Sequence, residues 1–149
     1  DRAYLSGQVV LVGHGRVGRR LAQTLATEGI PYVVVDQNRE LVDTLRQQGT
    51  PAVSGDAATP EVLVQAHIAH AAVLLVAIPD TVNVRKMVEI ARTLNPGIEV
   101  VLRTHNEEEA QLLQQEHVGT VFVGEHELAR GMGEHVVAHL RAAGAGRRP

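Results

Sequence analysis

The stretch VVLVGHGRVGRRLA, residues 9–22, decides how this chain folds. Its first four residues are apolar, which predicts a strand buried on both faces. After it, apolar side chains recur every fourth position and predict an amphipathic helix. Three glycines separate the two patterns, at Gly13, Gly15 and Gly18. The stretch therefore predicts a strand, a glycine-rich turn and a helix, in that order.

The same alternation continues along the chain. The predicted strands are 8–12, 32–35, 52–54, 73–78, 98–102 and 120–123. The predicted helices are 16–28, 38–48, 60–65, one capped by Asp80 or Thr81 that ends before Pro96, 106–115 and 125–141. Connections this long predict right-handed crossovers between parallel strands. We expect an α/β fold, a doubly wound six-stranded parallel sheet of the Rossmann type with order 3-2-1-4-5-6, in one domain (1–142) with a loose tail (143–149).

The composition excludes several classes of protein. The net charge of −3 gives no broad basic field, so we expect no nucleic-acid partner. The absence of cysteine rules out disulfides, thiolate nucleophiles and cysteine-ligated metals. The longest apolar runs, such as 71–79, are far shorter than the roughly 20 residues of a membrane helix. Because the chain opens at Asp1, we expect it to be part of something longer.

The glycine turn has the pattern of a phosphate-binding loop. Gly13 would permit the tight turn, Gly15 would let a phosphate approach the backbone, and Gly18 would let the helix lie close to the sheet. The free N–H groups at the helix start would then face the anion. Arg16 could bind a phosphate with two parallel hydrogen bonds. For His14, contact with the ligand and a place in the loop without such contact stay open as alternatives. Alternatively, the glycines only make a compact turn.

Two acidic residues follow neighbouring predicted strands. Asp36 would accept hydrogen bonds from ribose hydroxyls, and its charge would repel a 2′-phosphate, so a nucleotide with free ribose hydroxyls is favoured over NADP. Asp56 ends the third strand, where it either reaches the adenine or ribose or caps the next helix. Ile78 ends the fourth strand at the neighbouring crevice.

The signatures of catalysis are missing. The sequence contains no Tyr-x-x-x-Lys pair, nucleophile elbow or convincing Ser/His/Asp set. His126 and Glu127 begin like a zinc-protease helix, but Arg130 stands where the second histidine is needed. We therefore expect no catalytic residue and no metal site. The competing hypothesis is an NAD-dependent oxidoreductase fragment that lacks its substrate domain.

The last predicted helix carries more apolar surface than the sheet needs. Leu128, Met132, Val136 and Leu140 lie four residues apart on one stripe. Part of this stripe is expected to pack on its own domain. The surplus favours a second copy or another domain as a partner, with ordinary packing on the sheet as the alternative.

Several segments together resemble a known family. They are VGHGRVGRRLA, VVVDQNRELVDTLRQQG, SGDAATPEVL, AAVLLVAIPD and EVVLRTHNEEEAQLLQQEHVGTVFVGEHELARGM. The chain resembles the RCK domain, also called KTN or TrkA-N, and closely the version at the cytosolic end of Kef-type cation/proton antiporters. The likeness covers about residues 8–137 and rests on the GRVG, GDA and VxGExELAR signatures more than on the glycines.

The resemblance implies a regulatory, non-enzymatic domain that controls a K+/H+ antiporter. Its ligand would be an adenine nucleotide, AMP first, with ATP or NAD(H) as alternatives. It would form a homodimer through a C-terminal crossover helix and belong to the same parent chain as the membrane antiporter domain, at the cytoplasmic face of the inner membrane. A soluble potassium-uptake regulatory subunit is a further alternative.

The resemblance also implies a set of binding residues. The glycine turn and Arg16 would line the phosphate, Asp36 the ribose, and Asp56 with Ala57 the adenine. Arg103 would lie near the ligand and the dimer cleft. The complete predicted set is Gly13, His14, Gly15, Arg16, Val17, Gly18, Asp36, Gln37, Arg39, Asp56, Ala57, Ile78 and Arg103.

Overall fold

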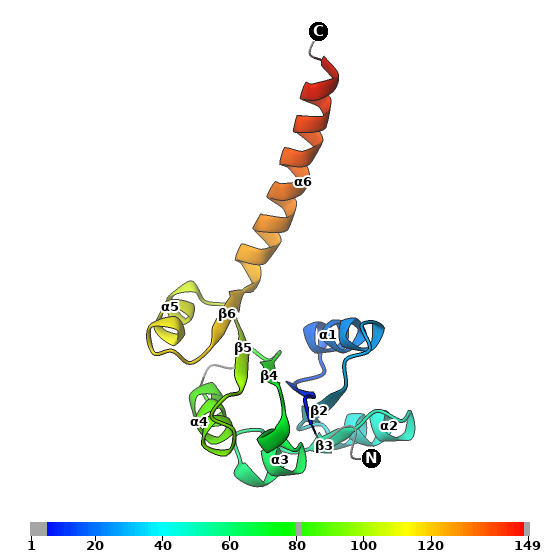
Figure 1. Ribbon diagram of the computed structural model, residues 1–149, viewed down its shortest axis with the longest axis vertical. Coiled ribbons are helices and arrows are strands. Elements are labelled where there is room, and N and C mark those ends of the chain that lie inside the picture. The colour runs from blue at the N-terminus through cyan, green and yellow to red at the C-terminus, as the bar shows by residue number, and fades with distance from the viewer. Residues whose placement is uncertain (1–5, 80–81, 148–149) are drawn as a thin grey trace.

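A six-stranded, entirely parallel sheet forms the centre of the molecule (Figure 1). The structure is a computed structural model that describes residues 6–79 and 82–147. The strands are β1 (Val9–Val12), β2 (Tyr32–Asp36), β3 (Ala52–Ser54), β4 (Val73–Val76), β5 (Glu99–Thr104) and β6 (Thr120–Val123). Their order is β3-β2-β1-β4-β5-β6, which confirms the predicted Rossmann-type topology.

Helices follow the strands in alternation, as predicted. They are α1 (Arg16–Thr27), α2 (Arg39–Gln47), α3 (Pro60–Gln65), a short 3₁₀ helix η2 (Ile68–His70), α4 (Val84–Leu94), α5 (Glu107–Gln115) and α6 (Gly124–Arg147). The predicted caps of the fourth main helix, Asp80 and Thr81, lie outside the described residues. Asn83 is the residue that precedes α4.

Alternate residues of each strand supply two aliphatic cores, one on each face of the sheet. On one face, α3, α4 and α5 pack against β-strand side chains such as Val10 and Leu74. On the other, α1 and α2 cover Leu11 and Val34. Burying a side chain of this size contributes roughly 1.5–3 kcal/mol. The two layers explain how a chain with 2% aromatic residues still builds a core.

The α1 side of the sheet is covered less completely at β5 and β6. Parallel pairing places Val101 and Arg103 on the same side as Leu11, through Leu75. Val101 and Arg103 are half-buried, and Phe122 in β6 is 43% exposed. On the opposite side, Val100 and Leu102 are buried.

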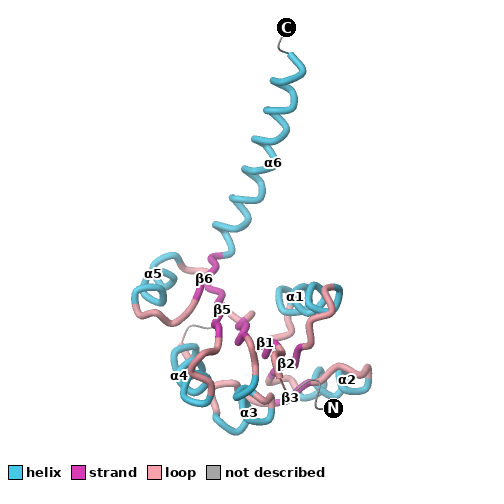
Figure 2. Tube along the Cα trace, in the orientation of Figure 1, coloured by secondary structure: helices cyan, strands magenta, loops and turns pink. Residues whose placement is uncertain are grey.

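Helix α6 leaves the sheet as a single long rod (Figures 1 and 2). The prediction that its apolar stripe packs partly on its own domain is wrong for the described residues, because the stripe is 53–65% exposed throughout (Leu128, Met132, Val136 and Leu140). Helix α6 extends as far as Arg147 and so includes most of the tail predicted from residue 143. The alanines at 142, 143 and 145 favour helix strongly enough to offset two neighbouring glycines. Residues 148–149 lie outside the described range.

Candidate functional site

The glycine turn between β1 and α1 has a different reason for each glycine. Gly13 has a φ of +97°, and a Cβ there would lie 2.6 Å from the Ile78 Cγ2 atom. A Cβ on Gly18 would collide with the carbonyl oxygen of Gly13, so α1 packs directly on the turn backbone. At Gly15 a Cβ would meet no protein atom within 4 Å. The fold thus requires the first and third glycines, and the backbone at Gly15 is open to an incoming group.

A pocket of about 210 Å³ lies beside this turn, at the carboxyl ends of β1 to β4. It is lined by Val12, Gly13, Val35, Asp36, Gln37, Gly55, Asp56, Ala57, Ile78, Asn83 and Met87. Six of these were predicted binding residues: Gly13, Asp36, Gln37, Asp56, Ala57 and Ile78. The carboxyl edge of a parallel sheet, on both sides of β1, is where α/β proteins of this topology bind ligands.

Asp36 joins the glycine turn to the start of α2. Its Oδ2 atom accepts a hydrogen bond from the backbone N–H of His14 at 2.9 Å, and its Oδ1 atom accepts one from the N–H of Asn38 at 2.8 Å. The Asn38 side chain in turn accepts from the N–H of Leu41 and caps α2. Each carboxylate oxygen keeps a second acceptor direction. The carboxylate is therefore fixed in place and can still accept a hydroxyl donor.

Asp56 does not cap the next helix, because the N-cap residue of α3 is Thr59, and no side-chain cap hydrogen bond is made there within the described part of the chain. Contact of Asp56 with the adenine or ribose stays a prediction. Asp56 lines the pocket, and its Oδ1 atom accepts a hydrogen bond from the N–H of Ala58 at 2.9 Å, which tightens the turn before α3. The residue before it, Gly55, was not in the predicted set. Its φ is +144°, and a Cβ there would lie 2.6 Å from Val62 Cγ2. The Gly-Asp pair after the third strand was the available signal for this residue.

The remaining predicted residues lie around the pocket or away from it. His14, Gly15 and Gly18 form the adjoining turn, and Val17 packs into the core beneath α1. Arg39 is exposed at the start of α2, outside the pocket lining.

The two other predicted arginines also lie outside the pocket lining. Arg16 lines a separate open hollow on the outer side of α1 with Arg19, Arg20 and Gln23. Arg103 donates from Nη1 to the carbonyl oxygen of Ala77 at 2.8 Å, just after β4.

His14 carries a buried ring nitrogen, Nδ1, without a hydrogen-bond partner in the described part of the chain. Burial lowers the pKa of this histidine below its ordinary value of 6.5, against a smaller opposing effect of Asp36 and with a smaller supporting effect of Arg19. His14 is therefore neutral at pH 7. A neutral imidazole keeps one nitrogen as an acceptor, beside the backbone N–H that holds Asp36.

Two pocket residues come from α4 and were missed by the sequence analysis. Asn83 immediately precedes this helix and Met87 lies in its first turn. Met87 is 2% exposed, so it also belongs to the core. Their contribution to the pocket comes from the way the start of α4 meets the carboxyl end of β4, which no local pattern describes.

Away from the pocket, three exposed side chains gather where α5 and α6 begin. Glu107, Glu125 and His126 bring possible metal-ligand atoms within 4.8 Å of one another. The His126 Nε2 atom lies 3.6 Å from a Glu107 carboxylate oxygen. The absence of a metal site stays a prediction.

A family model for the TrkA-N domain matches residues 9–124. The chain belongs to the TrkA-N domain family. It is 38% identical over 128 residues to the putative cation/proton antiporter YbaL of Escherichia coli K12, covering 86% of this chain and 23% of YbaL. It is 29% identical over 136 residues to the putative K(+) efflux antiporter KefB of Alkalimonas amylolytica, covering 91% of this chain and 21% of KefB. The chain thus spans about a fifth of the length of these curated relatives.

Solved structures agree with the family and the fold. The crystal structure of the TrkA-N domain of the inner membrane protein YbaL from Escherichia coli matches with a TM-score of 0.81 and 38% identity, over 87% of this chain and 96% of that domain. The AMP-bound Kef C-terminal domain of Shewanella denitrificans matches with a TM-score of 0.75 and 22% identity, over 90% and 81%. The GsuK channel bound to NAD matches with a TM-score of 0.67 and 21% identity, over 80% and 21%. The last two support the fold alone.

Among the described residues, every helix is too short or too polar to cross a membrane.

Proposed function

We propose that this chain is the nucleotide-sensing regulatory domain of a monovalent cation/proton antiporter, at the cytoplasmic face of the inner membrane. The observation that carries the proposal is the pocket at the carboxyl ends of β1 to β4, with the open backbone at Gly15 on one side and the anchored carboxylate of Asp36 on the other. Membership of the TrkA-N family and the antiporter names of the relatives supply the biological setting.

In this proposal the nucleotide lies across the sheet edge in three parts. The phosphate binds the backbone N–H groups at Gly15 and the start of α1, where the helix dipole favours an anion. Asp36 accepts from the ribose hydroxyls, and the adenine enters the pocket between Asp56, Ala57 and Ile78. The pocket is smaller than the roughly 300–1,000 Å³ of usual small-molecule sites. It therefore suits one nucleoside, with the phosphate outside on the turn.

The ligand we favour is AMP, with ADP, ATP and NAD(H) as alternatives. A carboxylate held at the ribose position disfavours a 2′-phosphate by charge repulsion, so NADP(H) is the weakest candidate. Two structures with the same fold support an adenine nucleotide, since by their titles one is a Kef domain with AMP and the other a channel with NAD.

The proposed partner is a second copy of the chain, joined through α6. The stripe on α6 leaves four large apolar side chains more than half exposed, which is unusual for a surface that stays in water. The partly covered side of β5 and β6 adds Phe122, which is 43% exposed. In a dimer that covers these surfaces, the two subunits can take two relative arrangements. The nucleotide shifts the equilibrium between these arrangements if it binds one of them more tightly.

The proposal includes no catalysis. In the pocket, the two carboxylates accept hydrogen bonds from backbone N–H groups, at His14 and Asn38 for Asp36 and at Ala58 for Asp56. Such carboxylates recognise and position a ligand. The signal would reach a membrane domain. In this proposal that domain lies outside this chain, in the rest of the parent protein.

Thermal melting with AMP, ADP, ATP, NADH and NADPH tests the proposal. A ligand at one hundred times its Kd should stabilise the domain by about 2.7 kcal/mol. We expect AMP or NADH to raise the melting temperature and NADPH to raise it less. Indifference to every adenine nucleotide would remove the sensing function, and oxidation of NADH by a carbonyl substrate would favour the oxidoreductase instead.

The variant Gly15→Val locates the site. Because a Cβ at this position meets no protein atom within 4 Å, we expect the fold to survive and AMP binding to be lost. Gly97→Val is the matched control, since this glycine is equally open but lies before β5, far along the chain from the turn. Normal AMP binding by Gly15→Val would show that the turn does not hold the phosphate.

A further inference from the structure

We propose that Arg85 is a positioning residue for the nucleotide pocket, because its ion pairs with α5 hold the pocket-lining start of α4 in place. This inference rests on the proposed function, since it concerns the same pocket. It adds a residue outside the pocket that tunes affinity without touching the ligand.

The start of α4 forms one wall of the pocket. Asn83 and Met87 line the pocket. Asn83 precedes the helix without making a side-chain cap hydrogen bond, and the first turn of α4 contains no acidic residue. Within the described ranges 6–79 and 82–147, neither a side-chain cap from Asn83 nor an acidic first turn stabilises this helix start.

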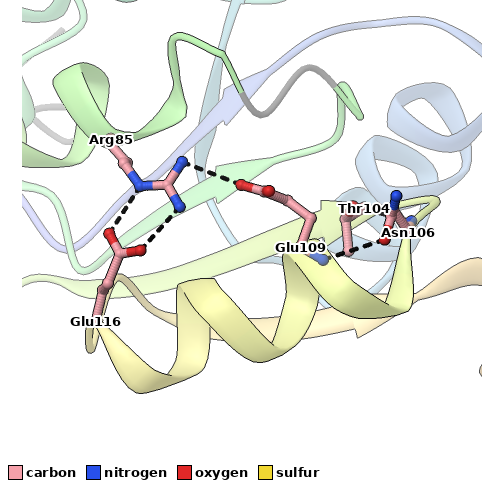
Figure 3. A network of polar contacts seen from close by, with 5 residues as sticks. All are labelled: Arg85, Thr104, Asn106, Glu109 and Glu116. Carbon is pink, nitrogen blue, oxygen red and sulfur yellow. Dashed lines mark hydrogen bonds and ion pairs between the residues drawn. The ribbon is translucent and has the colours of Figure 1, made fainter.

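Arg85 supplies a connection across to α5 (Figure 3). Its Nε and Nη2 atoms donate to the two carboxylate oxygens of Glu116, at 2.8 and 3.0 Å, in a bidentate pair. Its Nη1 atom donates to Glu109 at 3.0 Å. A planar guanidinium that binds two carboxylates in this way fixes direction as well as distance. We call Arg85, Glu109 and Glu116 the clamp.

The α5 side of the clamp is itself anchored. Figure 3 shows Asn106 at the start of α5, where its Oδ1 atom accepts from the N–H groups of Glu108 and Glu109. The Oγ1 atom of Thr104, a buried residue at the end of β5, accepts from the N–H of Asn106. The clamp therefore ties the start of α4 to a helix that is capped and joined to the sheet.

The far end of α4 is held by separate contacts. The Asn95 side chain donates to the carbonyl oxygens of Ile68 and Ala71, at 2.9 and 2.8 Å. Arg92 donates to the carbonyl oxygen of His117 at 2.8 Å. Arg85 and Arg92 thus link the same two parts of the structure, one near the pocket and one away from it.

The exposure of the clamp suits a positioning role. The side chains of Arg85, Glu109 and Glu116 are 40%, 24% and 45% exposed, and ion pairs this accessible contribute little to global stability. Beside Arg85, the Glu116 carboxyl has a pKa below its ordinary value, so both partners are charged at neutral pH. Loss of the clamp should therefore loosen the helix start more than it unfolds the domain.

The test compares Arg85→Gln with Arg92→Gln, two matched changes on one helix. Calorimetry should show that Arg85→Gln weakens AMP binding about five- to tenfold, while Arg92→Gln changes it less than twofold. Glu116→Gln should weaken binding as well, and the double variant Arg85→Gln/Glu116→Gln should bind no more weakly than Arg85→Gln alone. Equal effects of the two arginine variants, or none for Arg85→Gln, would overturn the proposal.

Hydrogen exchange on the ligand-free protein separates this inference from the proposed function. Amides of residues 82–88 should exchange several-fold faster in Arg85→Gln than in the parent chain and unchanged in Arg92→Gln. If the parent chain binds no adenine nucleotide, the proposed function fails while this exchange result still decides whether the clamp holds the start of α4. Unchanged exchange in Arg85→Gln would overturn the clamp even if AMP binds.

Discussion

The body of the domain and helix α6 both carry regular stripes of apolar side chains, which are buried in the body and exposed on α6. In α2, Val42 and Leu45 face the sheet and are 0% and 7% exposed. In α6, Leu128 and Met132 belong to an equally regular stripe but are 65% and 62% exposed. The body satisfies its own apolar surface within one chain, whereas α6 presents apolar surface that only another surface can cover.

The cause of this difference is the connection that precedes each helix. β6 ends at Val123 and α6 begins at Gly124, so no loop residues allow the chain to turn back onto the sheet. The turn between β1 and α1 contains three residues, Gly13 among them, and the fold needs both Gly13 and Gly18, which lies in α1, for close packing. The length of the preceding connection and the placement of glycines thus decide which helix packs on the sheet of its own domain.

A charge introduced on the apolar stripe of α6 should have the largest effect, and it should act on self-association. We expect Met132→Asp to weaken self-association more than a hundredfold, because a carboxylate would be buried in the proposed dimer. Arg141→Asp is the matched control, since helical spacing puts it on the opposite side of α6. Analytical ultracentrifugation measures both. A parent chain that is monomeric at high concentration, or unchanged association in Met132→Asp, would contradict the dimer.

A methyl group added at a glycine tests how closely the backbone packs there, and this packing is close at α1 and open along α6. Gly18→Ala should destabilise the domain by about 2 kcal/mol or more, because its Cβ would collide with the Gly13 carbonyl oxygen. Gly131→Ala in α6 meets no atom within 4 Å and should not destabilise the body. Urea unfolding of the two variants gives the comparison. A stable Gly18→Ala would mean that α1 can shift away from the turn.

Two arginines, one in the body and one in α6, give the comparison with the smallest expected effect on stability. Arg85 and Arg130 each pair with two glutamates, but Arg85 joins two elements while Arg130 pairs with Glu127 and Glu134 within α6. We expect Arg85→Gln to lower the stability of the body slightly and Arg130→Gln to leave it unchanged.

The effect of Arg85→Gln should depend on pH in a defined direction. The pKa of Glu116 is lowered in the folded state, so its contribution is complete above the ordinary value of 4.5 and is lost as pH falls through the lowered folded value. The stability difference between parent and Arg85→Gln should therefore stay constant from pH 8 to 5 and shrink below pH 4.5. A difference that grows on acidification would show that another group carries it.

The sheet and half of the pocket could be predicted from the sequence because their signals are local. Apolar runs predicted the strands, and the glycine turn with Asp36 after the second strand predicted where the pocket lies. The clamp could not be found this way, because Glu109 and Glu116 lie 24 and 31 residues from Arg85. Local pattern alone assigns the acidic run at 107–109 to the start of a helix, whereas Glu109 is a partner of the clamp.

The course of α6 was also beyond local pattern. Its apolar spacing is the same whether a helix folds back or projects outward, so periodicity predicted the stripe but not what covers it. Asn83 and Met87 entered the pocket for a related reason, since their place depends on how α4 meets the sheet. Long-range geometry decided each of these features.

The direct junction between β6 and α6 gives the molecule a lever. At 1.5 Å per residue, the 24 residues of α6 extend about 36 Å from the edge strand. A tilt of about 10° at Gly124 would move the far end of the rod by roughly 6 Å. Displacements too small to disturb the sheet are thereby magnified at Arg147, the end of the rod where the described chain stops.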